Sequence, residues 1–148
     1  MKKKPLTGWL ILLIVILGPV TFGQAGASFA RMDESYTPLI ARFPSLPRAL
    51  DVFKLLMGIS VCVSIFTAWV LYRRRSGALR IAQAGLVVRA VLMIASSIAF
   101  PMLAGFPPDV TQASYNDLVL PSAFVLLLTG VWYLYLIRSK RVLEIYAA

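Results

Sequence analysis

Residues 79–106 read LRIAQAGLVVRAVLMIASSIAFPMLAGF, and this stretch decides the fold class. It is longer than the roughly 20 apolar residues that an α-helix needs to cross the hydrocarbon core of a bilayer. Arg89 lies well inside it, where an ionisable side chain is costly and restricts how neighbouring helices pack. We therefore predict a membrane-spanning helix over about 79–105, with Arg89 as an intramembrane charge.

Three other apolar stretches predict further spans at about 6–24, 52–72 and 117–137. The chain has 148 residues, of which 59% are hydrophobic and 14% are charged, whereas about a quarter of a soluble domain is charged. These blocks predict an all-α membrane protein with one four-helix transmembrane domain over 1–148. Ala25-Gly26-Ala27 resembles a signal-peptide cleavage site, but the first apolar run exceeds a typical signal core, which favours an uncleaved span.

The basic residues are distributed unequally between the two sides of the predicted membrane. One side holds ten of them and the other holds four, which indicates that both termini lie in the cytoplasm. The ten are Lys2, Lys3, Lys4, Arg73, Arg74, Arg75, Arg80, Arg138, Lys140 and Arg141. The four are Arg31, Arg42, Arg48 and Lys54.

Both predicted outer loops carry helix signals. Thr37 has the character of a helix N-cap, and Pro38 follows it at the first helical position. This pattern predicts a short helix lying on the outer membrane surface. An alternative is that this helix is a lid or a docking element on another subunit. Its apolar positions are Tyr36, Leu39, Ile40 and Phe43. Residues 109–116 are predicted as the second outer loop, in which Ser114 and Asp117 have the spacing of a capping box.

Small residues within the second and third spans predict close helix–helix packing. Such residues let the backbones of membrane helices approach each other. The candidate packing residues are Gly58, Ser60, Ser64, Gly85 and Ser96.

Two positions of the Arg89 side chain relative to the membrane are compatible with the sequence. If the third span begins near residue 79, Arg89 lies deep in the membrane and needs a partner inside the bundle. If the span begins nearer Gly85, its long side chain extends to the cytoplasmic surface. Because no acidic residue lies inside the spans, with Asp117 only at the edge of the fourth, the candidate partners are backbone carbonyls, helix hydroxyls, a lipid phosphate and an acid on another protein. Arg89 is thus the candidate residue for ligand, lipid or partner contact.

A predicted cytoplasmic basic rim consists of Arg73, Arg74, Arg75, Arg138, Lys140 and Arg141. One interpretation is that these charges only orient the chain in the membrane. The alternative interpretation is that they also bind anionic lipid head groups. Since the basic residues cluster at the ends of apolar blocks and form no separate basic face, we expect no nucleic-acid partner.

The residues needed for most enzyme chemistry are missing. The sequence has no histidine and one cysteine, Cys62, and it has no phosphate-binding glycine loop, dinucleotide fingerprint or nucleophile-elbow motif. We therefore expect a protein that is not an enzyme, with no catalytic residue, metal site or cofactor.

The two ends of the chain resemble a known family. Thr7-Gly8-Trp9-Leu10 opens the first span, and Ile137-Arg138-Ser139-Lys140-Arg141-Val142 closes the last one, followed by the aromatic Tyr146. These segments resemble a bacterial inner-membrane family catalogued as domain of unknown function 2569. Many of its members carry two glycines before the tryptophan, and Thr7 replaces the first one here. The resemblance implies an integral protein of the bacterial inner membrane and implies no activity.

The sequence supports two functional hypotheses. The first is a non-catalytic accessory or assembly subunit of a larger inner-membrane complex, with other membrane subunits or a second copy as partner. It rests on the small size, the small soluble regions and the unpaired Arg89. The second is a small transporter, channel or lipid-binding protein in which Arg89 binds an anion or a lipid head group.

Overall fold

The computed structural model describes residues 8–74 and 77–146, apart from the side chain of Asp33, and consists of helices joined by short turns. No β-strand occurs in these two ranges, which confirms the prediction of an all-α protein. In chain order the elements are α1 (Gly8–Val15), the π-helical segment η1 (Ile16–Val20), α2 (Thr21–Ile40), α3 (Leu46–Arg73), α4 (Ala78–Ala104), α5 (Pro108–Arg138) and α6 (Lys140–Tyr146).

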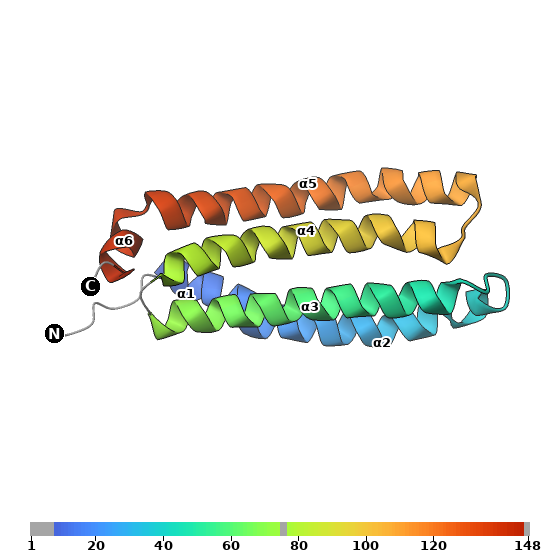
Figure 1. Ribbon diagram of the computed structural model, residues 1–148, viewed down its shortest axis with the longest axis horizontal. Helices are drawn as coiled ribbons and strands as arrows, with labels where there is room; N and C mark the ends of the chain where they lie inside the picture. The colour runs from blue at the N-terminus through green and yellow to red at the C-terminus, as the bar shows by residue number, and fades with distance from the viewer. Residues whose placement is uncertain (1–7, 75–76, 147–148) are drawn as a thin grey trace.

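Four helices are long and apolar enough to cross a membrane: the continuous first helix Gly8–Ile40, α3, α4 and α5. They contain 33, 28, 27 and 31 residues, so each exceeds a hydrocarbon core of roughly 30 Å at about 1.5 Å per residue. They lie side by side and alternate in direction (Figure 1). The chain is therefore a multi-pass helical membrane protein, as predicted.

The first helix combines α1, η1 and α2, and Pro19 explains its π-helical segment. Proline has no backbone N–H to donate to the carbonyl one turn back, and its ring displaces that carbonyl. The backbone N–H of Thr21 instead donates to Ile16 O, and the hydroxyl of Thr21 donates to the same oxygen at 2.6 Å. The helix thus continues past the proline with one wider turn.

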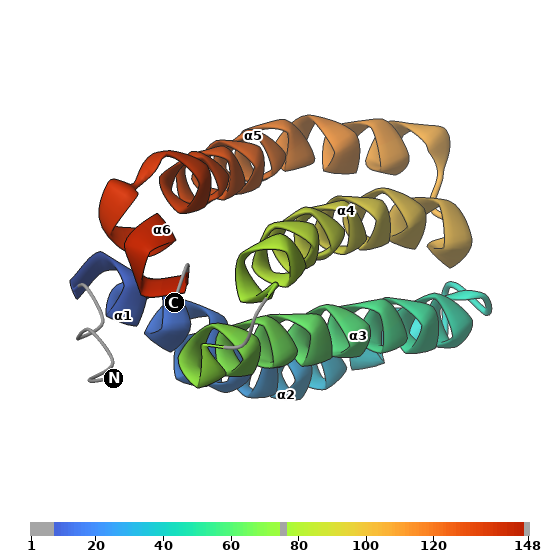
Figure 2. The ribbon, with the colours of Figure 1, turned by 60° about the vertical axis from the view of Figure 1, so that its left-hand side comes forward.

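α3 and α4 form the central pair of the bundle. They make the most extensive contact of any two helices, while α5 lies along α4 and the first helix lies against α3 (Figures 1 and 2). At Gly105, which ends α4, φ is +70°, a conformation that glycine adopts without strain. The hydroxyl of Ser45 donates to Ala104 O at 2.7 Å and links the start of α3 to the end of α4.

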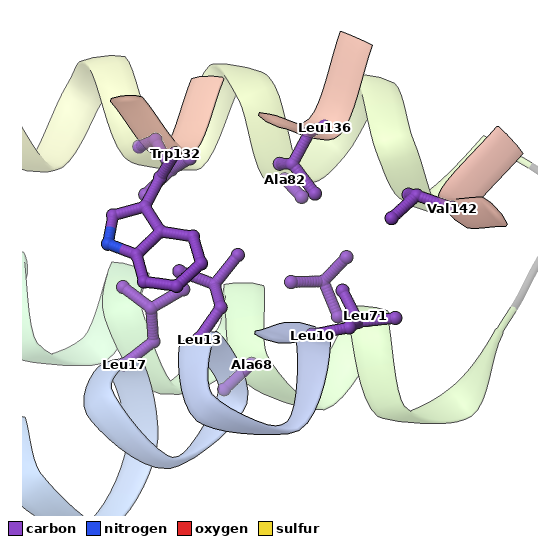
Figure 3. Packing of buried hydrophobic residues seen from close by; sticks show 10 residues of the cluster. Leu10, Leu13, Leu17, Ala68, Leu71, Ala82, Trp132, Leu136 and Val142 are labelled. Carbon is purple, nitrogen blue, oxygen red and sulfur yellow. The ribbon is translucent and has the colours of Figure 1, made fainter. Parts of the chain in front are cut away.

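Two apolar clusters hold the helices together at opposite ends. We call the end where α1 starts and α5 finishes the basic end, and the opposite one the distal end (Figure 1). The basic-end cluster joins the first helix to α5 and α6 and is shown in Figure 3. Its buried members are Leu10, Leu13, Leu17, Ala68, Leu71, Ala82, Leu86, Trp132, Leu136 and Val142. The distal cluster contains Leu46, Ala49, Leu50 and Ala104, with partly buried aromatic side chains packed on it.

The predicted outer segments are more helical than expected. Thr37 and Pro38 lie in the last turns of α2 and do not begin a separate helix. Residues 109–116, expected to be a loop, are helical because α5 begins at Pro108, where a proline suits the first turn. The expected capping box is absent, since the hydroxyl of Ser114 donates to Val110 O within the helix.

Candidate functional site

The small residues of α4 and α3 meet at the interface between these two helices. A Cβ atom added at Gly85 would overlap the side chain of Thr67 on α3, so the two backbones approach closely there. Ser60, Ser64 and Ser96 are buried. At Gly58, by contrast, an added Cβ would meet no atom within 4 Å, and nothing approaches this glycine closely.

The hydroxyls at this interface donate to carbonyls of their own helices. Ser64 Oγ donates to Ser60 O at 2.8 Å, and Thr67 Oγ1 donates to Val63 O at 2.7 Å. On α4, the buried Ser96 Oγ donates to Met93 O at 2.9 Å. The hydroxyl protons of Ser64 and Thr67 are therefore used within α3 and do not link the two helices.

Arg89 faces a cavity of about 410 Å³ between the first helix, α4 and α5. Leu86, Arg89 and Met93 all line it and lie on one side of α4, at helical spacings of three and four residues. The Arg89 side chain is half-buried, and its Nε atom is buried without a hydrogen-bond partner among the described residues. The structure thus places the arginine inside the bundle.

The depth of Arg89 follows from its position in α4. It lies eleven residues after Ala78, which corresponds to about 16 Å along a helix of about 39 Å. A hydrocarbon core of roughly 30 Å centred on this helix would put Arg89 well below its surface. The half-buried Arg89 side chain lines the cavity, which favours the first of the two predicted geometries, with the arginine inside the bundle.

Trp132 on α5 supplies a second donor to the same cavity. Its side chain is 7% exposed, and its Nε1 atom is buried without a partner among the described residues. In Figure 3 the indole nitrogen lies on the side of the ring turned away from Val142. Trp132 packs edge-to-face against Trp9, with 6.2 Å between ring centroids, and this contact helps to fix the ring.

The walls of the cavity are mostly apolar. Nine of the fourteen lining side chains are aliphatic, methionine or phenylalanine. The five polar ones are Thr21, Gln24, Arg89, Thr129 and Trp132. A buried donor without a partner costs about 1–3 kcal/mol, and here the two residues that hold such donors line the same cavity. Since a guanidinium matches the geometry of carboxylate and phosphate oxygens, the arrangement suits an anion.

The basic rim lies at the basic end of the bundle. Arg73, Arg138, Lys140 and Arg141 are exposed there, whereas Arg75 lies outside the described residues. The guanidinium carbon of Arg73 is 5.5 Å from the ring centroid of Trp69, a cation–π contact. These charges surround the ends of the helices and do not reach the Arg89 cavity.

A second cavity, of about 440 Å³, lies toward the distal end and is lined by aromatic side chains of α2, α3 and α4. Phe100 is in edge-to-face contact with Tyr36, Phe53 and Phe106. Asp117 is the one carboxylate that lines this cavity.

The sequence singled out Arg89 but not its neighbours in the cavity. Trp132 lies in the aromatic stretch Trp132-Tyr133-Leu134-Tyr135 near the end of α5, which is typical of a membrane interface, whereas its indole N–H lies inside the bundle. Thr129 and Trp132 are three residues apart and therefore lie on one face of α5. This spacing is the feature of the sequence that could have indicated that both residues line the cavity. Within the described residues, no group of three His, Cys, Asp or Glu side chains could hold a metal ion.

Comparison with known families identifies the chain. Residues 3–147 match the model of the family described as protein of unknown function (DUF2569), and the chain belongs to that family. Neither the curated proteins nor the solved structures contain a significant match.

Proposed function

We propose that this member of the DUF2569 family binds an anionic phosphate group in the cavity around Arg89. The observation that carries the proposal is that Arg89 and Trp132 both line one cavity and that each holds a buried donor, Nε and Nε1, without a partner among the described residues. A bound anion would accept hydrogen bonds from both and remove the cost of leaving them unmade. The proposal describes a binding protein and not an enzyme.

The two donors have different roles in the proposed site. The guanidinium of Arg89 stays charged at every physiological pH and supplies the attraction for an anion. The indole N–H of Trp132 is a neutral donor on a rigid ring, so it fixes the position of one acceptor oxygen. The hydroxyl of Thr129 and the amide of Gln24 are further polar groups in the same wall.

A thermal-shift titration tests the proposal. The purified full-length protein in a non-ionic detergent is titrated with octyl phosphate and, separately, with methyl phosphate, and the unfolding midpoint is recorded. We expect at least one of these anions to raise the midpoint. Arg89→Gln should weaken its binding by about 10- to 100-fold, the equivalent of a hydrogen bond to a charged group. Trp132→Phe should weaken it by about 3- to 10-fold.

Arg80→Gln is the matched control, because Arg80 lies on the same helix but is exposed and does not line the cavity. This variant should respond as the unchanged protein does. If neither anion shifts the midpoint, or if Arg89→Gln and Arg80→Gln respond equally, the proposal is wrong.

A second candidate function is that of an accessory subunit of a larger membrane complex. It is supported by α5, which buries only Trp132 and Leu136 among the described residues and exposes many large apolar side chains. Either lipid or another membrane protein can cover this face. The native mass of the protein extracted from its own membranes in mild detergent, with the co-eluting proteins identified, tests this candidate. A single chain with no co-eluting protein would contradict it.

The orientation of the chain is also part of the proposal. The basic end carries Arg73, Arg138, Lys140 and Arg141 and, by the positive-inside rule, faces the cytoplasm of a bacterial cell. A reporter fused after α6 should then be active only if it functions in the cytoplasm. Activity of a periplasmic reporter at this position would contradict the orientation.

A further inference from the structure

We infer that the ligand of the Arg89 cavity is an anionic amphiphile, with its charged head on Arg89 and Trp132 and its hydrocarbon tail between the first helix and α5. This inference rests on the proposed anion binding and names the class of ligand.

The cavity is larger and more apolar than a small inorganic anion requires. A volume of about 410 Å³ lies in the range typical of sites for small organic ligands. Leu128, Val125 and Ile16 are among the apolar side chains that line it. These walls offer no hydrogen bonds to the remaining oxygens of a free phosphate, whereas they offer favourable apolar contact to an alkyl chain.

The cavity reaches the surface between the first helix and α5. Leu13, Leu17 and Leu86 on its inner side are at most 2% exposed. Two other lining residues, Val20 on the first helix and Phe124 on α5, are 39% and 64% exposed. The cavity is therefore closed toward the centre of the bundle and open along the flank where Val20 and Phe124 lie.

This opening lies at the level of the hydrocarbon core. Val20 and Phe124 are both about 20 Å from the ends of their helices at the basic end, which is close to the middle of each helix. A hydrated anion would have to cross hydrocarbon to reach an opening at this level, and that transfer is very costly. An amphiphile already has its tail in the hydrocarbon, so only its head must move to Arg89.

The basic end is closed by packing among the described residues. The apolar cluster that includes Leu10, Leu13, Trp132, Leu136 and Val142 lies between the first helix and the helices α5 and α6 there (Figure 3). Trp132 belongs both to this cluster and to the lining of the cavity, and its nitrogen lies on the side of the ring turned away from Val142 (Figure 3). The tail therefore extends from the head group toward the flank and not toward the basic end.

The test compares octyl phosphate, methyl phosphate and octanol on the full-length protein in a non-ionic detergent. Octyl and methyl phosphate share the charged group and differ in tail length, while octanol has the tail without the charge. We expect octyl phosphate to bind at least about 10-fold more tightly than methyl phosphate, since burial of two methylene groups is enough for that gain. Octanol should give no shift that depends on Arg89.

A cavity-filling variant separates binding of the tail by the protein from its partition into the detergent micelle. Val125→Phe places a larger side chain in the wall of the cavity. It should weaken the binding of octyl phosphate by about 10-fold, whereas the affinity for methyl phosphate should stay within about 2-fold of that of the unchanged protein. Val119→Phe is the matched control: Val119 lies on the same helix, is 68% exposed and does not line the cavity. The partition of octyl phosphate into the detergent micelle is the same for Val125→Phe and Val119→Phe. Leu128→Phe repeats the test if Val125→Phe does not fold.

The outcomes distinguish this inference from the proposed function. If methyl phosphate binds as tightly as octyl phosphate and both depend on Arg89, the protein binds a free anion and the amphiphile inference is overturned. Equal loss of octyl phosphate binding in Val125→Phe and Val119→Phe would also overturn it. If neither phosphate binds, the proposed function itself fails.

Discussion

The surface of α4 is packed differently toward α3 and toward the first helix and α5, although Gly85 and Arg89 are only four residues apart. Toward α3, Gly85 lies against Thr67, and the interface hydroxyls donate to carbonyls of their own helices. Toward the first helix and α5 there is a cavity, with two buried donors that have no partner among the described residues. Toward α3, no described buried polar side-chain atom is without a hydrogen-bond partner, so we interpret this interface as structural. The two buried donors without a partner belong to residues on the cavity side, and for this reason the proposed function is placed there.

The largest effect is expected from filling the close approach between α3 and α4. Gly85→Ala puts a Cβ into the side chain of Thr67, and overpacking of this kind typically costs about 1–3 kcal/mol of stability. Thermal unfolding in detergent should show a clearly lower midpoint. Removal of the obstructing hydroxyl and methyl groups in the double variant Gly85→Ala/Thr67→Ala should restore part of the loss.

Gly58→Ala is the control for this prediction, because a Cβ at Gly58 meets nothing within 4 Å. Its midpoint should stay the same or rise slightly, since alanine favours a helix more than glycine does. If the two alanine variants are equally stable, the interface between α3 and α4 is not the rigid part of the molecule.

The second largest effect is a gain in stability, and it concerns the cavity. Arg89→Leu replaces a side chain that holds an unpaired buried donor by one that suits the apolar walls. We expect the protein without added phosphate ligand to gain about 1 kcal/mol, because the cost of the unmade hydrogen bond disappears. The same variant should lose the response to octyl phosphate.

A gain in stability coupled to a loss of binding is typical of a residue kept for function. The measurement is again the unfolding midpoint, taken with the protein washed free of phospholipid. A large loss of stability in Arg89→Leu would mean that the arginine supports the fold, and the contrast between the two sides of α4 would then disappear.

The smallest effect concerns α6, which links the end of α5 to α3. The Tyr146 hydroxyl donates to Leu71 O at 2.6 Å, and Tyr146→Phe removes this bond at a cost of about 0.5–1.5 kcal/mol. Burial raises the pKa of Tyr146 to about 12, against an opposing effect of Arg74 and a smaller raising effect of Tyr135.

The pKa of Tyr146 predicts a pH dependence. Between the ordinary value of 10.0 and about 12, the folded protein holds the phenol proton that the unfolded chain loses. The stabilisation is therefore complete below pH 10 and falls as the pH rises toward 12. The unfolding midpoint of Tyr146→Phe should fall less steeply over this range than that of the unchanged protein. Tyr72→Phe, at an exposed tyrosine of α3, should keep the steep fall.

Much of the fold was predictable because membrane insertion depends on local composition. Four apolar stretches are long enough to cross a bilayer wherever they occur in a chain, so their number and approximate positions could be read from the sequence. The limits of the helices were less predictable. Pro38 lies inside α2 and residues 109–116 are helical, because the helices continue beyond their most apolar segments.

The candidate site was predictable only in part. Arg89 could be identified because a lone charge in an apolar stretch is conspicuous in any context. Trp132, Thr21 and Thr129 could not be assigned to it, since they come from segments far from Arg89 in the sequence. Their meeting depends on how α5 and the first helix are rotated, which no local pattern specifies.

The sequence by itself determined that this is a membrane protein of four apolar helices with one charge inside the third. The tertiary structure decided that Gly85 faces α3 and that Arg89 and Trp132 share a cavity. The physical reason is that lipid and helix surfaces are almost equally apolar, so hydropathy does not mark which face of a membrane helix meets a neighbour. That choice is made by the fit of side chains between helices, and it exists only in the folded bundle.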